Sequence, residues 1–300
     1  MASHSHHSHH NHTSGKNLKT AFLLNLGFTI FELIGGFYVN SVAIISDAIH
    51  DLGDSISLGT AWYLDTKSKQ KPTRTFTFGY RRFSLLGALI NSLVLIVGSI
   101  YVIIEAIGRI IEPELIDPQG MLIFAIIGVG VNGFAAWKMS KGKSLNERVI
   151  SWHLLEDVLG WFAILVAAVI LQFWDIPYLD PALSLGFGMF ILSNVFLRLK
   201  ETLMVFLQGH PEDVDREKIE KELLAIDKIE SIHHMHIWSL DGEHHVFSAH
   251  FKLKEITGLE ELLIVKNQIK AYLKKYNFEH LTVEIETANE CCEFSEEMEE

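Results

Sequence analysis

The chain has little cysteine: Cys291 and Cys292, adjacent in the sequence, are the only two among its 300 residues. Neighbouring cysteines rarely form a good disulfide with each other, which excludes an extracellular disulfide framework. The chain also lacks a basic surplus, because 25 Lys and Arg stand against 37 Asp and Glu, for a formal net charge of -12. Since nucleic acid binds to a basic face, this balance argues against nucleic acid as a partner.

The N-terminal segment lacks the basic start and apolar run of a secretory signal peptide. It has histidine at positions 4, 6, 7, 9, 10 and 12 instead. Expression tags usually run six histidines without interruption, so we interpret residues 1–16 as a native, disordered cytoplasmic tail that binds metal. The acidic end, residues 290–300, is also expected to be disordered. Its two cysteines either chelate a thiophilic metal as thiols or lie in a tail too disordered to place them.

Apolar sequence is abundant: 49% of the residues are hydrophobic, and the mean hydropathy is +0.23. Long hydrophobic runs fill the first two hundred residues, and each is long enough to cross a hydrocarbon core of about 30 Å. They predict an α-helical membrane protein whose transmembrane domain covers residues 17–207. The six expected spans are Ala21–Tyr38, Val42–Leu64, Phe83–Ile104, Gly120–Ala136, Val149–Phe173 and Leu179–Leu197.

The loops between these spans differ in charge. Ten cations lie after the second and fourth spans, at positions 67, 69, 71, 74, 81, 82, 138, 141, 143 and 148. The loops on the opposite side are acidic, and Arg109 is the lone cation near them. Because loops rich in Lys and Arg stay inside, we expect a multi-pass protein of the cell membrane with both termini in the cytoplasm.

A soluble pattern begins at residue 208 and continues to 289. Its expected elements, in order, are a helix, two strands, a second helix and a third strand: Pro211–Asp227, Ile229–Leu240, His245–Lys254, Leu259–Tyr276 and His280–Glu286. This αββαβ order predicts one small α+β domain with its helices on one face of a sheet.

Two histidines interrupt the long apolar region, and each is followed four residues later by Asp: His50 with Asp54, and His153 with Asp157. Residues at this spacing share one face of a helix. An Asp inside a membrane segment costs roughly 2.5 to 3.5 kcal/mol on insertion scales, so such residues are functional candidates. Two imidazoles and two carboxylates make a tetrahedral site that suits Zn²⁺ better than Mg²⁺ or Ca²⁺. The alternative is a polar patch facing a water-filled vestibule, or a hydrogen bond that joins two helices.

Three acidic neighbours rank below these four candidate ligands. Asp47 shares the face of Asp54. It either accepts a hydrogen bond from the His50 ring and orients it, or takes protons near the mouth of the site. Asp51 and Glu156 are each adjacent to a candidate ligand and are expected to point elsewhere.

The chemistry of the candidate ligands points to exchange of metal for protons. Metal competes with protons for neutral imidazole, so His50 and His153 are natural proton acceptors when zinc leaves. Moving a divalent ion out of an inside-negative cell costs about 2 × 2.3 kcal/mol per 100 mV. No G-x-x-x-x-G-K-[ST] nucleotide-binding loop is present, so an entering proton is the simplest driving ion.

The soluble part is rich in histidine as well. Strand alternation predicts His234 and His236 on one face and His233 on the other. His250 on the next strand, with Glu284 and Glu286 on the third, gives a candidate metal cluster, and surface histidines are the alternative. Trp238 is expected in the core.

Several motifs resemble the cation diffusion facilitator family of zinc transporters. They are the stretch Asn40–His50 leading to Asp54, Phe78–Arg82 before the third span, His153–Asp157, and His234–Leu240. The resemblance implies Zn²⁺/H⁺ antiport by alternating access in a homodimer, with a ferredoxin-like cytoplasmic domain. It also implies a regulatory cytoplasmic zinc site at His233, His250, Glu284 and Glu286, although Glu replaces the family's usual histidine and aspartate on the last strand.

The same resemblance separates the candidate functions. The loop Thr66–Arg82 has no histidine, so the extra metal site that some family members carry there is expected to be absent. The short loop Lys138–Arg148 favours a bacterial protein.

Zinc is the expected cargo, with Cd²⁺ and Co²⁺ as additional candidates and Mn²⁺ disfavoured by His50 and His153. A membrane metalloenzyme is the runner-up, but H-E-x-x-H is missing and four ligands leave no open position. A metal sensor without transport would not account for the membrane ligands.

Overall fold

The computed structural model describes residues 11–68, 72–140, 145–256, 258–276, 278–290 and 292. Side chains are described from residue 19 onward, excluding those of residues 64–66, 68, 139 and 145–154 within the helices. Two compact units make up the chain, one from residues 1–70 and 87–199 and the other from residues 71–86 and 200–300. Most of the predicted histidine tail therefore lies outside the described residues, and so does Cys291.

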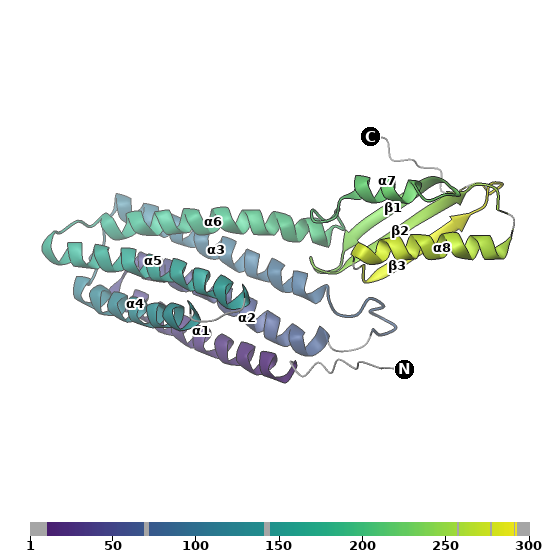
Figure 1. Ribbon diagram of the computed structural model, residues 1–300. Helices are drawn as coiled ribbons and strands as arrows, with labels where there is room; N and C mark the ends of the chain where they lie inside the picture. Colours follow the sequence, from purple (N-terminus) through teal and green to yellow (C-terminus); the bar gives the residue numbers. More distant parts are fainter. Residues whose placement is uncertain are drawn as a thin grey trace. The chain divides into compact units, whose positions relative to one another are not determined.

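Six long helices occupy the apolar region (Figure 1). Five of them contain segments long and apolar enough to cross a membrane. The other, α2, is more polar because it carries Asp47, His50, Asp51 and Asp54. The helices are α1 (Asn11–Val39), α2 (Val42–Ser68), α3 (Phe83–Ile111), α4 (Pro118–Ser140), α5 (Leu145–Phe173) and α6 (Leu179–Phe206). Most of them extend beyond the predicted spans, because a helix does not have to end where its sequence turns polar.

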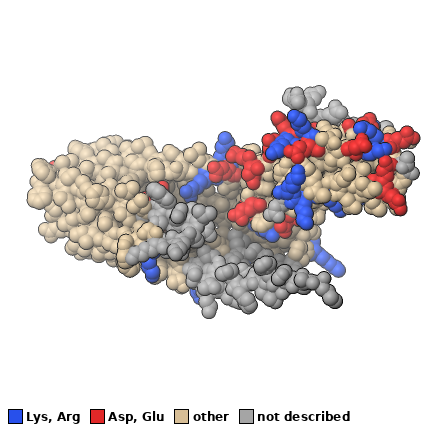
Figure 2. Space-filling model, in the orientation of Figure 1, with Lys and Arg blue, Asp and Glu red and all other residues tan. Residues whose placement is uncertain are grey.

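The helices of the first unit pack as α1 on α2, α4 on α5, α1 on α4 and α2 on α5. Trp161 of α5 is 1% exposed in their apolar core. It lies against Gly128 of α4, where a Cβ would come 2.1 Å from the indole ring. Figure 2 shows a visible face of this unit with almost no charged side chain, whereas Lys, Arg, Asp and Glu gather over the later elements. An uncharged outer surface is what a lipid environment requires.

The remaining elements form a small α+β domain (Figure 1). Strand β2 is central, antiparallel to β1 and parallel to β3. Both helices cover one face, where Ile219 and Leu223 of α7 and Ile269 of α8 join the apolar side chains of the strands. The elements are α7 (Arg216–Leu224), β1 (Ile229–Ser239), β2 (His245–Leu253), α8 (Leu259–Leu273), a 3-10 turn (Lys274–Tyr276) and β3 (His280–Glu286). The predicted element order and the placement of both helices on one face are confirmed.

The predicted bounds of both helices are wrong, and α7 ends at Leu224 rather than Asp227. Helix α7 begins at Arg216 rather than Pro211, because the Asp215 carboxylate accepts a hydrogen bond from the backbone N–H of Lys218 and caps the helix there. Helix α8 ends at Leu273, and the chain continues into the 3-10 turn. Tightening of the last turn is common at helix ends.

A β-bulge interrupts β1. His233 pairs with His250, but the next pair is His236 with Ser248, so β1 contains one extra residue. His234 sits in the bulge with φ +47°. Its ring lies 5.2 Å from that of His250, and the His233 ring lies 5.4 Å from the same ring. His234 and His236 share a face as predicted, since their rings stack at 6.4 Å. The predicted opposite placement of His233 is wrong, because the bulge turns it to that same face, away from the helices.

Candidate metal sites

Helices α2 and α5 bring three of the four predicted transmembrane ligands together. Nε2 of His50 lies 3.9 Å from Oδ2 of Asp54, one turn along α2. The same nitrogen lies 3.9 Å from Oδ1 of Asp157 on α5. Asp157 is 9% exposed, whereas His50 and Asp54 are about a third and a quarter exposed at 32% and 26%. The side chain of His153 is outside the described residues.

The acidic neighbours take different positions. Asp47 faces α5, since its Oδ1 lies 3.5 Å from where a Cβ on Gly160 would be. Asp51 is buried at 4% exposure, and the Asn25 side-chain amide of α1 donates to its carbonyl oxygen at 3.0 Å. Glu156 is exposed. Glu156 is thus open to solvent, whereas Asp51 is buried where α2 packs on α1.

Glu32 of α1 is an acidic residue that the sequence did not single out. Its side chain is fully buried at 0% exposure. It interacts electrostatically with Asp51, Asp47 and Asp157, so carboxyl groups from α1, α2 and α5 converge on one region of the helical unit. Its position within an apolar run, with no histidine one helical turn away, gave no local signal of this role.

Asp180 of α6 is a second such residue, and it holds the start of α2. Its carboxylate accepts a hydrogen bond from the Ser41 hydroxyl and from the backbone N–H of Val42 at 2.9 Å and of Ala43 at 3.3 Å. A carboxylate at this position accepts hydrogen bonds from N–H groups that have no partner within α2. Its negative charge is also stabilised by the positive end of the α2 dipole. Asp180 thereby fixes the helix that presents His50.

The second cluster lies on the open face of the sheet. Nε2 of His233 and Nδ1 of His250 lie 3.0 Å and 2.9 Å from the same oxygen, Oε1 of Glu286. Nε2 of His250 lies 3.3 Å from Oε2 of Glu284. Burial raises the pKa of the Glu286 carboxyl, but the hydrogen bonds from His250 and His233 outweigh it and hold this pKa below its usual 4.5.

Cys292 joins this cluster. Its Sγ lies 3.9 Å from Nδ1 of His250. Ligand atoms of His233, His250, Glu286 and Cys292 all lie within 4.8 Å of one another, a spacing that one metal ion can bridge. Glu284 is 61% exposed and does not belong to this compact group. The sequence pointed to three of these four residues and left Cys292 open.

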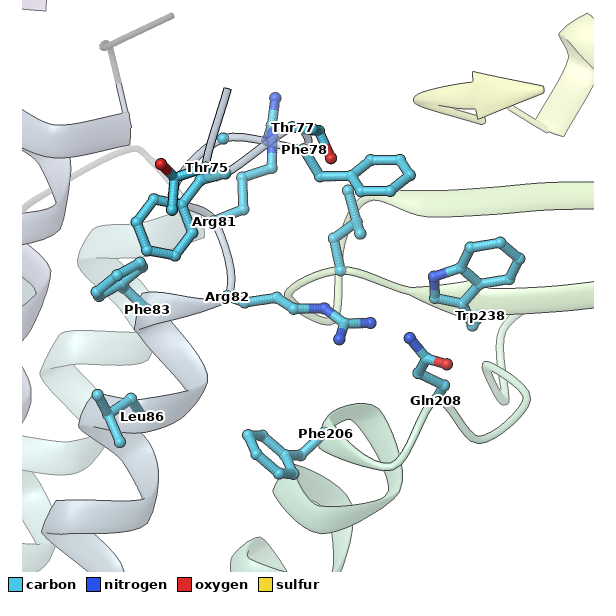
Figure 3. A pocket seen from close by; sticks show the side chains of 13 residues that line it. Thr75, Thr77, Phe78, Arg81, Arg82, Phe83, Leu86, Phe206, Gln208 and Trp238 are labelled. Atoms are coloured by element: carbon cyan, nitrogen blue, oxygen red, sulfur yellow. The ribbon is translucent and has the colours of Figure 1, made fainter. Parts of the chain in front are cut away.

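The loop before α3 contacts the α+β domain. Arg81 lies 3.1 Å from Oε1 of Glu279 and 3.8 Å from Oδ2 of Asp241. A cavity of about 440 Å³ lies beside Arg81. Its lining includes the Arg82 side chain, which extends toward Gln208 and Trp238 (Figure 3).

Trp238 was expected in the core but lines this cavity instead. It follows the bulge on the same face of β1 as His236, which is the face away from the helices.

Comparison with known proteins identifies the fold and its class of activity. Residues 18–207 match the family described as cation efflux transmembrane domain, and residues 211–288 match the cation efflux protein, cytoplasmic domain. A cadmium, cobalt and zinc/H(+)-K(+) antiporter of Bacillus subtilis is 34% identical, over 91% of this chain and 89% of the relative. The metal cation efflux system protein CzcD of Cupriavidus metallidurans is 32% identical, over 96% and 90%. The zinc transporter ZitB of Escherichia coli is 31% identical, over 95% and 91%. With its multi-pass helical part and its small cytoplasmic domain, the chain belongs to the cation diffusion facilitators, a family of divalent-metal efflux transporters rather than enzymes.

Proposed function

We propose that this protein exports Zn²⁺ from the cytoplasm in exchange for protons, with Cd²⁺ and Co²⁺ as additional cargo. The observation that carries the proposal is the 3.9 Å approach of His50 on α2 to Asp157 on α5. It places two ligand types from two helices beside each other inside an apolar unit. The names of the relatives, which include cadmium, cobalt, zinc and H⁺, support the same cargo and exchange.

The transport site consists of His50, Asp54, His153 and Asp157, with Asp47 behind them. Two imidazoles and two carboxylates satisfy a tetrahedral ion fully. A saturated site has no open position for a substrate, which favours carriage of the ion over catalysis at it. Because the four ligands come from two helices, a small shift of α2 against α5 changes the site, which suits alternating access.

Protons enter the cycle at the histidines. Zinc binds neutral imidazole, so a proton arriving at His50 or His153 competes directly with the ion. The ordinary pKa of histidine, about 6.5, lies close to physiological pH, which allows modest pH differences to drive the exchange. Proton entry into an inside-negative cell offsets the cost of moving a divalent cation outward.

The placement of the chain follows from its loop charges. Ten cations lie in or beside the connections from α2 to α3 and from α4 to α5. They favour the cytoplasmic side, which puts both termini and residues 208–289 in the cytoplasm of a cell-membrane protein. The transmembrane part then covers residues 17–207. The αββαβ order with both helices on one face agrees with a ferredoxin-like domain, and two such domains pair in the proposed homodimer.

A second metal site, on the cytoplasmic domain, senses the ion. It is built around His233, His250 and Glu286, with Glu284 as the fourth residue predicted from the sequence. Metal bound there joins β1, β2 and β3, the three strands that supply these side chains. Such cross-strand binding is able to stabilise the domain when cytoplasmic zinc is high.

Zinc uptake into inside-out membrane vesicles under an imposed pH gradient tests the proposal. His50→Ala and Asp157→Ala are expected to abolish gradient-driven uptake, because each removes a ligand. Glu156→Ala is the matched control, since Glu156 is exposed and adjacent to Asp157 on α5. Uptake that survives in either ligand variant, with protein levels equal to wild type, would refute the assignment.

A further inference from the structure

The two ring nitrogens of His250 face different partners. Nδ1 lies 2.9 Å from Oε1 of Glu286 and 3.9 Å from Sγ of Cys292. Nε2 lies 3.3 Å from Oε2 of Glu284. The lone pairs of the two ring nitrogens diverge in the ring plane, so one ion bound at Nδ1 has Glu286 and Cys292 as its neighbours. Glu284 lies on the other side of the ring and is poorly placed to bind the same ion.

Glu286 is the buried anchor of the group on the Nδ1 side. Its side chain is only 6% exposed. One of its oxygens, Oε1, contacts both histidines, whereas Oε2 is buried without a hydrogen-bond partner among the described residues. A buried carboxylate oxygen without a partner is costly, and native structures rarely keep one without a reason. A bound cation would satisfy it.

The chain is folded back to bring Cys292 to this position. A turn follows β3, in which the Glu290 backbone N–H donates to the Thr287 carbonyl at 3.0 Å. The Glu290 carboxylate accepts from the Thr287 backbone N–H at 3.1 Å and closes the turn. Cys292 is partly buried after this turn. Its approach to His250 therefore follows a hydrogen-bonded turn at the end of β3.

We propose that His233, His250, Glu286 and Cys292 bind one thiophilic divalent cation, such as Cd²⁺ or Zn²⁺, with Cys292 in the place expected for Glu284. The inference rests on the proposed function, since it specifies the ligands and regulation of the cytoplasmic site. A thiolate makes the site softer than one of nitrogen and oxygen alone, which favours Cd²⁺ and Zn²⁺ over Mn²⁺. It also ties the C-terminal segment to the sheet when metal is bound, so that metal occupancy sets the position of that segment.

Co²⁺ binding to the purified, reduced full-length protein provides a direct test, because cobalt–thiolate bonds give an intense near-ultraviolet charge-transfer band. The transmembrane ligands contain no sulfur, so the band reports on Cys291 and Cys292 alone. Wild type and Cys291→Ser are expected to show the band, and Cys292→Ser to lose it. Glu284→Gln is expected to keep it, and Glu286→Gln to require at least about tenfold more Co²⁺, since about 1.4 kcal/mol of binding energy corresponds to tenfold. Cd²⁺ is expected to displace the bound Co²⁺.

The outcomes separate this inference from the transport proposal. His50→Ala is expected to lose zinc transport and to keep the charge-transfer band, because His50 is not in the cytoplasmic cluster. Absence of the band in wild type, its persistence in Cys292→Ser, or its equal loss in Cys291→Ser would each overturn the inference. None of these results would alter the outcome of the vesicle assay. Conversely, normal transport by His50→Ala would refute the transport site and leave the Cys292 site standing.

Discussion

Nε2 of His50 and Oδ1 of Asp157 lie 3.9 Å apart across the packed helices α2 and α5. The two residues are far apart in the sequence, and each begins from a local H-x-x-x-D pattern. Their approach makes the site depend on the packing of two helices rather than on either helix alone. A change in ligand type at His50 therefore changes the chemistry of the site without changing its framework.

The first prediction follows from ligand type. His50→Asp replaces a borderline nitrogen donor by a hard oxygen donor, and Mn²⁺ prefers carboxylate more than Zn²⁺ does. We expect the ratio of Mn²⁺ to Zn²⁺ transport to rise by about tenfold or more, which corresponds to about 1.4 kcal/mol. Competition between the two metals in vesicle uptake measures this ratio. An unchanged ratio, in a variant that still transports zinc, would show that His50 does not select the metal.

The second prediction concerns the cap of α2. Asp180→Ala removes the acceptor for Ser41, Val42 and Ala43 and leaves polar groups buried without a partner. We expect a loss of about 2 kcal/mol or more in the free energy of unfolding. Thermal unfolding in detergent should occur several degrees lower. Asp175→Ala is the control, since Asp175 is exposed near the start of the same helix, and an equal change in both variants would contradict the capping role.

Much of the helical part could be predicted from the sequence, since apolar runs and the spacing of His50 and Asp54 are local properties. Asp180 and Glu32 could not be identified in this way. The hydrogen bond from Ser41 to Asp180 joins residues separated by 139 positions, and an acidic residue in an apolar helix does not reveal which helix it faces. Such partners emerge only from tertiary packing.

In the cytoplasmic cluster, too, local patterns predicted some residues and tertiary structure decided the others. Strand alternation predicted the shared face of His234 and His236, but it failed at His233 because a bulge adds a residue to β1. A bulge has no strong sequence signal when its left-handed residue is histidine rather than glycine. Cys292 reaches the cluster through a turn after β3. The acidic sequence of this segment predicted disorder, so it did not indicate that Cys292 would lie beside His250.

The third prediction concerns acid stability at the turn between β1 and β2. Oδ1 of Asp241 accepts from the backbone N–H groups of Glu243 at 3.1 Å and of His244 at 2.9 Å. Partial burial raises the pKa of Asp241, but these hydrogen bonds outweigh it and hold the pKa below its usual 3.8. A depressed carboxyl pKa stabilises the fold above the usual value, and this stabilisation is lost as pH falls through the folded-state pKa.

Asp241→Asn lacks this titration. The difference in unfolding temperature between wild type and Asp241→Asn should therefore shrink as pH falls from about 5 to about 3. Thermal unfolding of the two full-length proteins across this range measures the difference. All other titrating groups are common to both proteins, so their effect largely cancels when the two unfolding temperatures are subtracted. A constant difference over the whole range would mean that the Asp241 carboxylate does not stabilise the turn through its charge.

The last prediction concerns the loop before α3. Arg81 contacts Glu279 and Asp241, and the nearby Phe78 ring packs edge-on against His280 at 5.5 Å. Each exposed ion pair contributes about 0 to 1 kcal/mol, whereas Arg81→Glu replaces both attractions by repulsion and should weaken loop docking by about 1 kcal/mol or more.

Cysteines at positions 78 and 280, in a background with serine at 291 and 292, measure that docking by their rate of crosslinking. Arg81→Glu should slow the crosslink several-fold. Arg74→Glu is the matched control, because Arg74 lies in the same loop, is exposed, and makes no ion pair among the residues that the structure describes. An equal effect of both reversals would attribute the change to loop charge in general, whereas a selective effect of Arg81→Glu would show that its two carboxylate partners hold the loop on the domain.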